Sequence, residues 1–201
     1  FVPVPGIKAD YHEVDFENLH GEEEIVNLGE NQLRTELEKL PCCATNEEGT
    51  ENGDPLNLVL IGSREDLSSA FVRRGWLPAE QTYSTAVWKT IKSFLFGSRY
   101  RYSPVSPLYF SKRQQDFAGQ KPRHTVHQRN HLRVWLSPLR YQGKPVWIGQ
   151  ISRDIGVRFT VKAWPPVTHK IDPDIDEAMY ALMEDLIYSQ QLAKIGWVKG
   201  V

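Results

Sequence analysis

The alternation of hydrophobic and polar residues is clearest between Arg129 and Phe159. Every second residue from Leu132 to Leu136 is aliphatic, which is the period-two pattern of a β-strand with one buried face. Turn-forming residues interrupt the segment near Gln142-Gly143 and again at Asp154–Gly156. The pattern therefore predicts three consecutive strands, joined by two turns.

The first turn also predicts how the first two strands pair. One face would be apolar and would pair Leu136 with Trp147, Val134 with Gly149, and Leu132 with Ile151. The opposite face would pair Trp135 with Ile148, Arg133 with Gln150, His131 with Ser152, and Arg129 with Asp154. A slip of one residue would exchange the two faces, so this register is a hypothesis about both of them.

The polar face of this hairpin contains the candidate ligand-binding residues. Two arginines on one strand could present planar guanidinium groups to a phosphate or carboxylate, and the histidine between them could donate a proton. The candidates are Arg129, His131, Arg133, Ser152, Asp154 and His169. The alternatives are a solvent-facing sheet surface, or a structural network in which Arg129 pairs with Asp154 and His131 bonds Ser152.

Helical spacing of apolar residues predicts helices elsewhere in the chain, over residues 32–40, 64–74, 84–96 and 173–191. Ser63 and Asp66 form a capping box at the start of the second helix, and Gly75 ends it. Asp172 is the predicted N-cap of the last helix, with Pro173 at its first position.

The remaining segments are expected to be mostly irregular, apart from a short buried strand at Leu56–Ile61. Residues 42–55 are rich in turn formers, and residues 111–128 suggest a basic loop that carries His124 and His127. The predicted fold is α+β, with a mainly antiparallel sheet of about five or six strands covered by three or four helices. Residues 1–30 are expected to form an extended acidic arm, and residues 31–201 a single domain.

The composition permits one sizeable core, since 40% of the 201 residues are hydrophobic. No apolar run reaches the roughly 18 residues of a membrane-spanning helix. The chain begins at Phe1 rather than Met, which suggests that a leader, anchor or tag was removed or left out. A disulfide between the adjacent Cys42 and Cys43 would close a strained eight-membered ring, so packed or partner-bridged thiols are expected.

The charges are distributed unevenly along the chain. Residues 1–54 carry fourteen acidic and three basic residues, a net charge of −11, so that residues 55–201 carry about +10. No acidic residue occurs between Asp116 and Asp154, whereas seven basic residues do. This asymmetry indicates either an anionic partner for the body or an acidic arm that folds back and neutralises it.

Six short motifs combine into a recognisable set. They are G-D-P-L-N-L-V-L-I-G (Gly53–Gly62), A-F-V-R-R-G-W (Ala70–Trp76), S-P-L-Y-F (Ser106–Phe110), R-N-H-L-R-V-W (Arg129–Trp135), V-W-I-G (Val146–Gly149) and H-K-I-D-P-D-I-D (His169–Asp176). Together they resemble the family named for the C-terminal domain of the bacterial LssY protein, over about residues 30–200. Domains of that family often follow membrane-embedded segments, including lipid-phosphatase-like and DedA-like regions, or stand behind an export signal.

That resemblance implies a cell-envelope setting, periplasmic or extracytoplasmic and membrane-associated. It supplies no assigned activity, no cofactor and no catalytic residue.

Metal sites are weakly indicated. His124, His127 and His131, with Asp154 or His169, could complete a zinc or copper shell, but no H-E-x-x-H or similar ligand spacing is present. The acids at 172, 174 and 176 resemble a calcium loop, but Glu177 stands where glycine is needed and Met183 where glutamate is needed. We therefore expect no metal and no cofactor.

A nucleophilic site is also weakly indicated. Ser152, His131 and Asp154 could act as nucleophile, base and orienting acid, but the chain lacks the G-x-S-x-G elbow. No residue is therefore assigned a catalytic role from the sequence.

Two functional hypotheses remain. The first is a non-catalytic accessory domain of the cell envelope that docks on a membrane-protein partner or on an anionic ligand, either a phosphate or a lipid head group. The alternative is a hydrolase or transferase that acts on a phosphorylated or acylated lipid-like substrate through His131, Arg133 and Asp154. Nucleic acid is not expected as a partner, because apolar strand positions interrupt the basic stretch and the acidic arm would repel a phosphate backbone.

Overall fold

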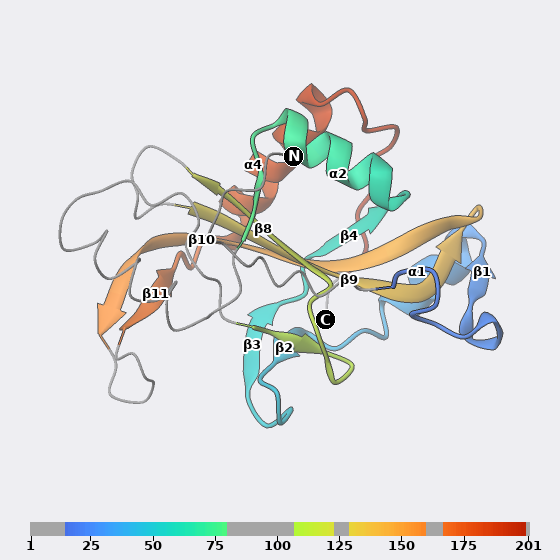
Figure 1. Cartoon of the computed structure of the whole chain (residues 1–201), viewed down its shortest axis with the longest axis horizontal. Helices are drawn as coiled ribbons and strands as arrows, with labels where there is room; N and C mark the ends of the chain where they lie inside the picture. The colour runs from blue at the N-terminus through green and yellow to red at the C-terminus, as the bar shows by residue number, and fades with distance from the viewer. Residues whose placement is uncertain (1–14, 80–106, 123–128, 160–166, 200–201) are drawn as a thin grey trace, which may run out of the picture.

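The computed structural model describes residues 15–79, 107–122, 129–159 and 167–199. Its central feature is a long antiparallel hairpin of β9 (Arg129–Tyr141) and β10 (Lys144–Phe159), shown in Figure 1. A seven-stranded sheet is built on this hairpin, in the order β11-β10-β9-β8-β5, with β1 also paired to β9 and β4 to β10. The added strands are β1 (Val26–Leu28), β4 (Leu58–Ile61), β5 (Leu77–Pro78), β8 (Phe117–Pro122) and β11 (Val167–Ile171).

The predicted register of the hairpin is confirmed at all seven pairs, from Leu136 opposite Trp147 to Arg129 opposite Asp154. Gln142 and Gly143 form the turn with φ angles of 51° and 75°. Two consecutive residues with positive φ are typical of the tight turn that matches the twist of a hairpin. The turn therefore sets which side chains face each other along both strands.

The predicted second turn at Asp154–Gly156 is wrong. β10 continues through this point to Phe159 and pairs with β11, and the register shifts between Asp154 and Gly156. Such a bulge accommodates an extra residue while the strand goes on. The segment therefore forms two long strands instead of three short ones.

The apolar face of the hairpin packs under two helices, α2 (Arg64–Arg73) and α4 (Ile175–Tyr188), which lie on the same side of the sheet in Figure 1. Leu132, Val134, Leu136, Trp147 and Ile151 form one core cluster with side chains from both helices, Phe71, Ala178 and Leu182. Full burial stabilises a large apolar side chain by about 1.5–3 kcal/mol. This cluster holds the helices to the sheet.

The opposite face of the hairpin is covered near its turn by α1 (Glu30–Leu37) and a small sheet. Leu33 and Leu37 of α1 pack on Val146 and Ile148 of β10. The small sheet has the order β3-β2-β6-β7, with β2 at Cys43–Thr45, β3 at Asn52–Pro55, β6 at Tyr109–Phe110 and β7 at Arg113–Gln114. The described part of the chain thus has three layers around the hairpin, and the predicted α+β class is confirmed.

Two segments expected to be loops contain strands. Residues 42–55 hold β2 and β3, and residues 111–128 hold β7 and β8. Turn formers are frequent in both segments, but pairing with neighbouring strands overrides their local preference. Cys42 and Cys43 at the start of β2 are joined by a disulfide, which corrects the expectation of separate thiols.

The predicted helices have the following outcomes. The capping box of α2 is confirmed, because Ser63 accepts from Asp66 N and Asp66 accepts from Ser63 N. The last helix begins later than predicted, with Asp174 as its N-cap, and it ends at Tyr188. Asp172 instead accepts hydrogen bonds from Arg153. The helix predicted at 84–96 lies outside the described residues, as do His124 and His127.

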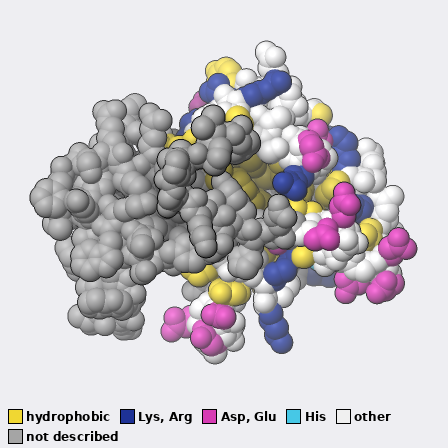
Figure 2. All heavy atoms as spheres, in the orientation of Figure 1, with side chains coloured by type: hydrophobic (Ala, Val, Ile, Leu, Met, Phe, Trp, Pro, Cys, Tyr) yellow, Lys and Arg dark blue, Asp and Glu magenta, His cyan; other side chains and the backbone are white. Residues whose placement is uncertain are grey.

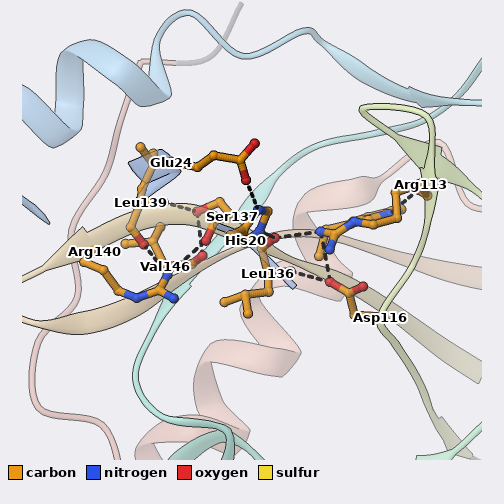
Figure 3. A network of polar contacts seen from close by, with 10 residues as sticks. His20, Glu24, Arg113, Asp116, Leu136, Ser137, Leu139, Arg140 and Val146 are labelled. Carbon is orange, nitrogen blue, oxygen red and sulfur yellow. Dashed lines mark hydrogen bonds and ion pairs between the residues drawn. The ribbon is translucent and has the colours of Figure 1, made fainter. Parts of the chain in front are cut away.

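The N-terminal segment is tied to β9 through the polar network shown in Figure 3. β8 pairs with β9 only as far as Val134, so the backbone of Leu136 needs other partners. Its N–H donates to Asp116 Oδ2 at 2.6 Å, and its carbonyl oxygen lies 2.7 Å from Arg113 Nη2 and 2.9 Å from His20 Nε2. Side chains therefore complete the edge of β9 where β8 ends.

The turn geometry predicts the effect of one substitution. Gly143→Ala is expected to lower the free energy of unfolding by about 1 kcal/mol, because the left-handed region is unfavourable for a residue with a Cβ atom. Urea denaturation of both proteins would measure this difference. Gln142→Gly is the matched control and should not destabilise, because it removes a side chain from a residue at positive φ. Equal losses in the two variants would contradict the assignment.

Asp116 predicts a pH dependence of stability. Burial raises the pKa of this carboxyl group above 3.8, although the Leu136 N–H and Arg113 oppose the shift. The folded state thus takes up the proton at higher pH than the unfolded state, and this contribution to stability is lost as pH rises through the folded pKa. Relative to Asp116→Asn, the wild type should gain stability as pH falls from 7 to 4.

Urea denaturation of both proteins across that range checks this prediction. Asp15→Asn is a control of opposite sign, because hydrogen bonding from Asn18 lowers the pKa of the exposed Asp15. A wild-type advantage that is constant with pH would contradict the role of Asp116.

Candidate functional site

The sheet brings nine residues of three strands into a regular array on one face. The registers of β8, β9 and β10 align them in three rows, Gln120–His131–Ser152, Ala118–Arg133–Gln150 and Pro122–Arg129–Asp154. Alternate residues of a strand point to the same side, so the side chains of one row lie next to each other. We call the polar members of this array, together with Asp54 of β3, the polar cluster.

The polar cluster is buried. Arg129, His131, Arg133, Ser152 and Asp154 each expose at most 6% of their surface, and Gln120 and Gln150 expose none. The alternative of a solvent-facing sheet surface is therefore wrong. Ionised side chains are rarely buried unless they are paired, so the contacts inside the cluster decide its chemistry.

A histidine–aspartate pair occupies the middle of the cluster. His131 Nε2 lies 2.5 Å from Asp154 Oδ2, with both side chains almost fully buried. The two residues sit on adjacent strands, in neighbouring rows of the array. A carboxylate in this position orients an imidazole ring and stabilises its protonated form. The pair therefore has the geometry of an acid–base group.

Each of the two arginines donates to a glutamine. Arg129 Nη1 donates to Gln120 Oε1 at 2.8 Å, and Arg133 Nη1 donates to Gln150 Oε1 at 2.8 Å. These glutamines come from the strands on either side of β9. Both guanidinium groups are thereby held beside His131.

Asp54 enters the cluster from the small sheet. Its Oδ2 atom lies 3.2 Å from Arg133 Nη1 and accepts from Ser152 Oγ at 3.5 Å. The register between β2 and β3 shifts so that β3 has an extra residue opposite Ala44. Bulges of this kind redirect side chains next to functional sites. Asp54 thus joins the two sheets through an ion pair.

Burial and charge act against each other in this pair. Burial raises the pKa of Asp54, whereas the nearby Arg133 guanidinium opposes the shift. Burial also lowers the pKa of Arg133, and the carboxylates of Asp54 and Asp154 oppose that shift. The charge of each partner therefore offsets part of the effect of burial on the pKa of the other.

Five of the six candidate residues predicted from the sequence come together here. The sixth, His169, lies on β11 opposite Val157, and its side chain is outside the described set. Within the cluster, His131 contacts Asp154 and Ser152 bonds Asp54.

Three residues of the cluster were missed by the sequence analysis. Asp54 was assigned to a loop, although it lies in the motif Gly53–Gly62, which contributes to the family resemblance. Gln150 was predicted as the partner of Arg133 but was not considered as a ligand-binding residue. Gln120 could be found only from the pairing of β8 with β9, which the predicted basic loop concealed.

A metal site is not formed by the described residues, in which no group of three or more His, Cys, Asp and Glu side chains could hold an ion. The acids that resemble a calcium loop have other contacts. Asp172 bonds Arg153, and Asp174 accepts from Glu177 N at the start of α4.

Comparison with protein families identifies the relatives of this chain. The family described as the LssY C-terminus matches residues 34–201. The chain belongs to this family. Searches of curated proteins and of solved structures found no match. Among the described residues of this LssY C-terminal domain, no helix has the length and hydrophobicity needed to cross a membrane.

The Asp54–Arg133 pair predicts a strong coupling between two mutations. Asp54→Asn and Arg133→Met should each lower the free energy of unfolding by about 3 kcal/mol, because each leaves a buried charge without this partner. The double variant should lose less free energy of unfolding than the sum of the losses in the two single variants.

Urea denaturation of the four proteins measures this coupling. The exposed pair of Glu36 and Lys39, whose atoms are 2.7 Å apart, is a matched control for which a coupling below about 1 kcal/mol is expected. Additive losses for Asp54 and Arg133 would show that the buried pair is not coupled.

Proposed function

We propose that this LssY C-terminal domain is a hydrolase or transferase of the cell envelope, with a phosphorylated or acylated lipid-like substrate. The observation that carries the proposal is the buried pair of His131 on β9 and Asp154 on β10, whose Nε2 and Oδ2 atoms are 2.5 Å apart. β9 also places Arg129 and Arg133 on either side of the histidine. Titratable groups with perturbed pKa values are concentrated at active sites, and Asp54 and Arg133 are such groups.

In this proposal His131 transfers a proton. Asp154 contacts Nε2, so Nδ1 would exchange a proton with the attacking water of a hydrolase or the acceptor hydroxyl of a transferase. Arg129 and Arg133 would bind the anionic part of the substrate and stabilise the negative charge that develops on it. Asp54 would position Arg133, and Gln150 would support the same guanidinium group.

The proposed envelope setting has two supports. The first is membership of the LssY C-terminal family, since the resemblance implies association with the membrane. The second is the Cys42–Cys43 disulfide, because disulfides persist mainly in oxidising compartments outside the cytoplasm.

The hypothesis of a docking domain has less support. It assigned docking to the basic face of the hairpin, but the side chains of that face are buried. On the face shown in Figure 2, the described basic side chains are interspersed with acidic ones. A protein partner in the membrane would need a different surface.

One set of exposed side chains favours docking as a second candidate function. Val72 of α2 and Tyr180, Ile187 and Tyr188 of α4 each expose about half of their surface or more. Residues 180 and 187 are two turns apart and lie on the same side of the helix. Exposed apolar and aromatic side chains on neighbouring helices are typical of protein interaction surfaces.

A turnover assay distinguishes the two candidates. The folded wild type is expected to hydrolyse 4-nitrophenyl phosphate or 4-nitrophenyl esters of fatty acids presented in detergent micelles. His131→Gln should lower kcat at least about 100-fold. Asp154→Asn should also lower kcat and should alter its dependence on pH. Tyr180→Ala, at an exposed position of α4, is the control that should keep full activity.

Two results would contradict the hydrolase or transferase. One is a folded wild type that turns over neither substrate class, which would favour the docking function. The other is an activity that His131→Gln leaves unchanged, which would place the reaction elsewhere or in a contaminant.

A further inference from the structure

The amide groups of Gln120 and Gln150 are an unexplained feature of the polar cluster. Both side chains are fully buried, and the Nε2 atom of each has no hydrogen-bond partner. Leaving a buried donor unsatisfied costs about 1–3 kcal/mol. Two such donors, on the strands that flank His131, indicate that a ligand or an ordered water accepts their hydrogen bonds.

The orientation of both amides is fixed by arginines. Gln120 Oε1 accepts from Arg129, and Gln150 Oε1 accepts from Arg133. Rotating either amide by 180° would place its NH₂ group against a guanidinium group, which has no acceptor. Each Nε2 donor is therefore held in one direction, without the entropy cost of ordering it when a ligand binds.

The donors define the chemistry of the ligand. The two unsatisfied amide donors come from β8 and β10, the strands on either side of β9. A carboxylate has two acceptor oxygens in one plane, whereas a phosphate has three or four oxygens in a tetrahedral arrangement. Donors distributed on both sides of β9 match the tetrahedral group better.

We propose that Gln120 and Gln150 bind the oxygen atoms of a phosphate group, so that the substrate of this site is a phosphomonoester. This inference rests on the proposed function and narrows its substrate from phosphorylated or acylated molecules to phosphorylated ones. It also gives the two glutamines a binding role that is separate from proton transfer by His131.

Binding of inorganic phosphate tests the inference without requiring turnover. The full chain is titrated with inorganic phosphate, and with acetate as a planar anion, by isothermal titration calorimetry. The wild type is expected to bind phosphate more tightly than acetate. Gln120→Glu and Gln150→Glu keep an acceptor for the arginine but remove the NH₂ donor, so each should weaken phosphate binding at least about tenfold.

Two further variants separate contact from charge. Gln142→Glu makes the same change in the exposed hairpin turn and should leave phosphate binding unchanged. Gln150→Met removes the amide without adding a negative charge and should also weaken binding at least about tenfold. Circular dichroism and melting temperature identify any variant that fails to fold, and the Glu variants are expected to fold because the contact with arginine remains.

Three results would overturn the inference. The first is a folded wild type that does not bind phosphate, and the second is a wild type that binds acetate more tightly than phosphate. The third is that the Gln→Glu variants bind phosphate like the wild type, which would mean that water alone satisfies the amides. Hydrolysis of fatty-acid esters that depends on His131, without phosphate binding, would overturn this inference and keep the proposed function. Phosphate binding without any turnover that depends on His131 would support this inference and overturn the proposed function.

Discussion

The register of the β9–β10 hairpin is the constraint on which the rest of the structure depends. The turn at Gln142 and Gly143 places Leu132 and Ile151 on one face, and His131 and Asp154 on the other. A shift of one residue would expose the apolar core and remove the acid–base pair at the same time. Stability and the candidate site thus depend on the same local geometry, and each further layer of the fold packs on one of the two faces.

The two faces contribute differently to stability. The apolar face packs under α2 and α4, and it supplies the favourable burial that holds the domain together. The polar face buries two arginines, a histidine and an aspartate, and such groups seldom stabilise a fold more than well-packed apolar residues of similar size. The small sheet contributes Asp54, which offsets the charge of Arg133. The energetic cost of this face is the physical reason to look there for function.

Much of the hairpin and of the site could be predicted, because a strand of alternating residues identifies its faces locally. All seven cross-strand pairs and five of the six candidate residues were obtained in this way. The errors occurred where strand pairing overrides a local preference for turns. The bulge at Asp154–Gly156 was taken for a turn, and β2, β3 and β8 were taken for loops, because turn formers are frequent in segments that nevertheless pair with neighbouring strands.

The sequence by itself determined the α+β class, the two faces of the hairpin and the family. Only the tertiary structure decided that the polar face is buried, that Asp54 joins it from the small sheet, and that Gln120 and Gln150 hold the two arginines. The reason is that period-two alternation specifies the face to which a side chain belongs, but not what covers that face. Burial, and with it the change in the pKa of Asp54, depends on segments brought together by folding.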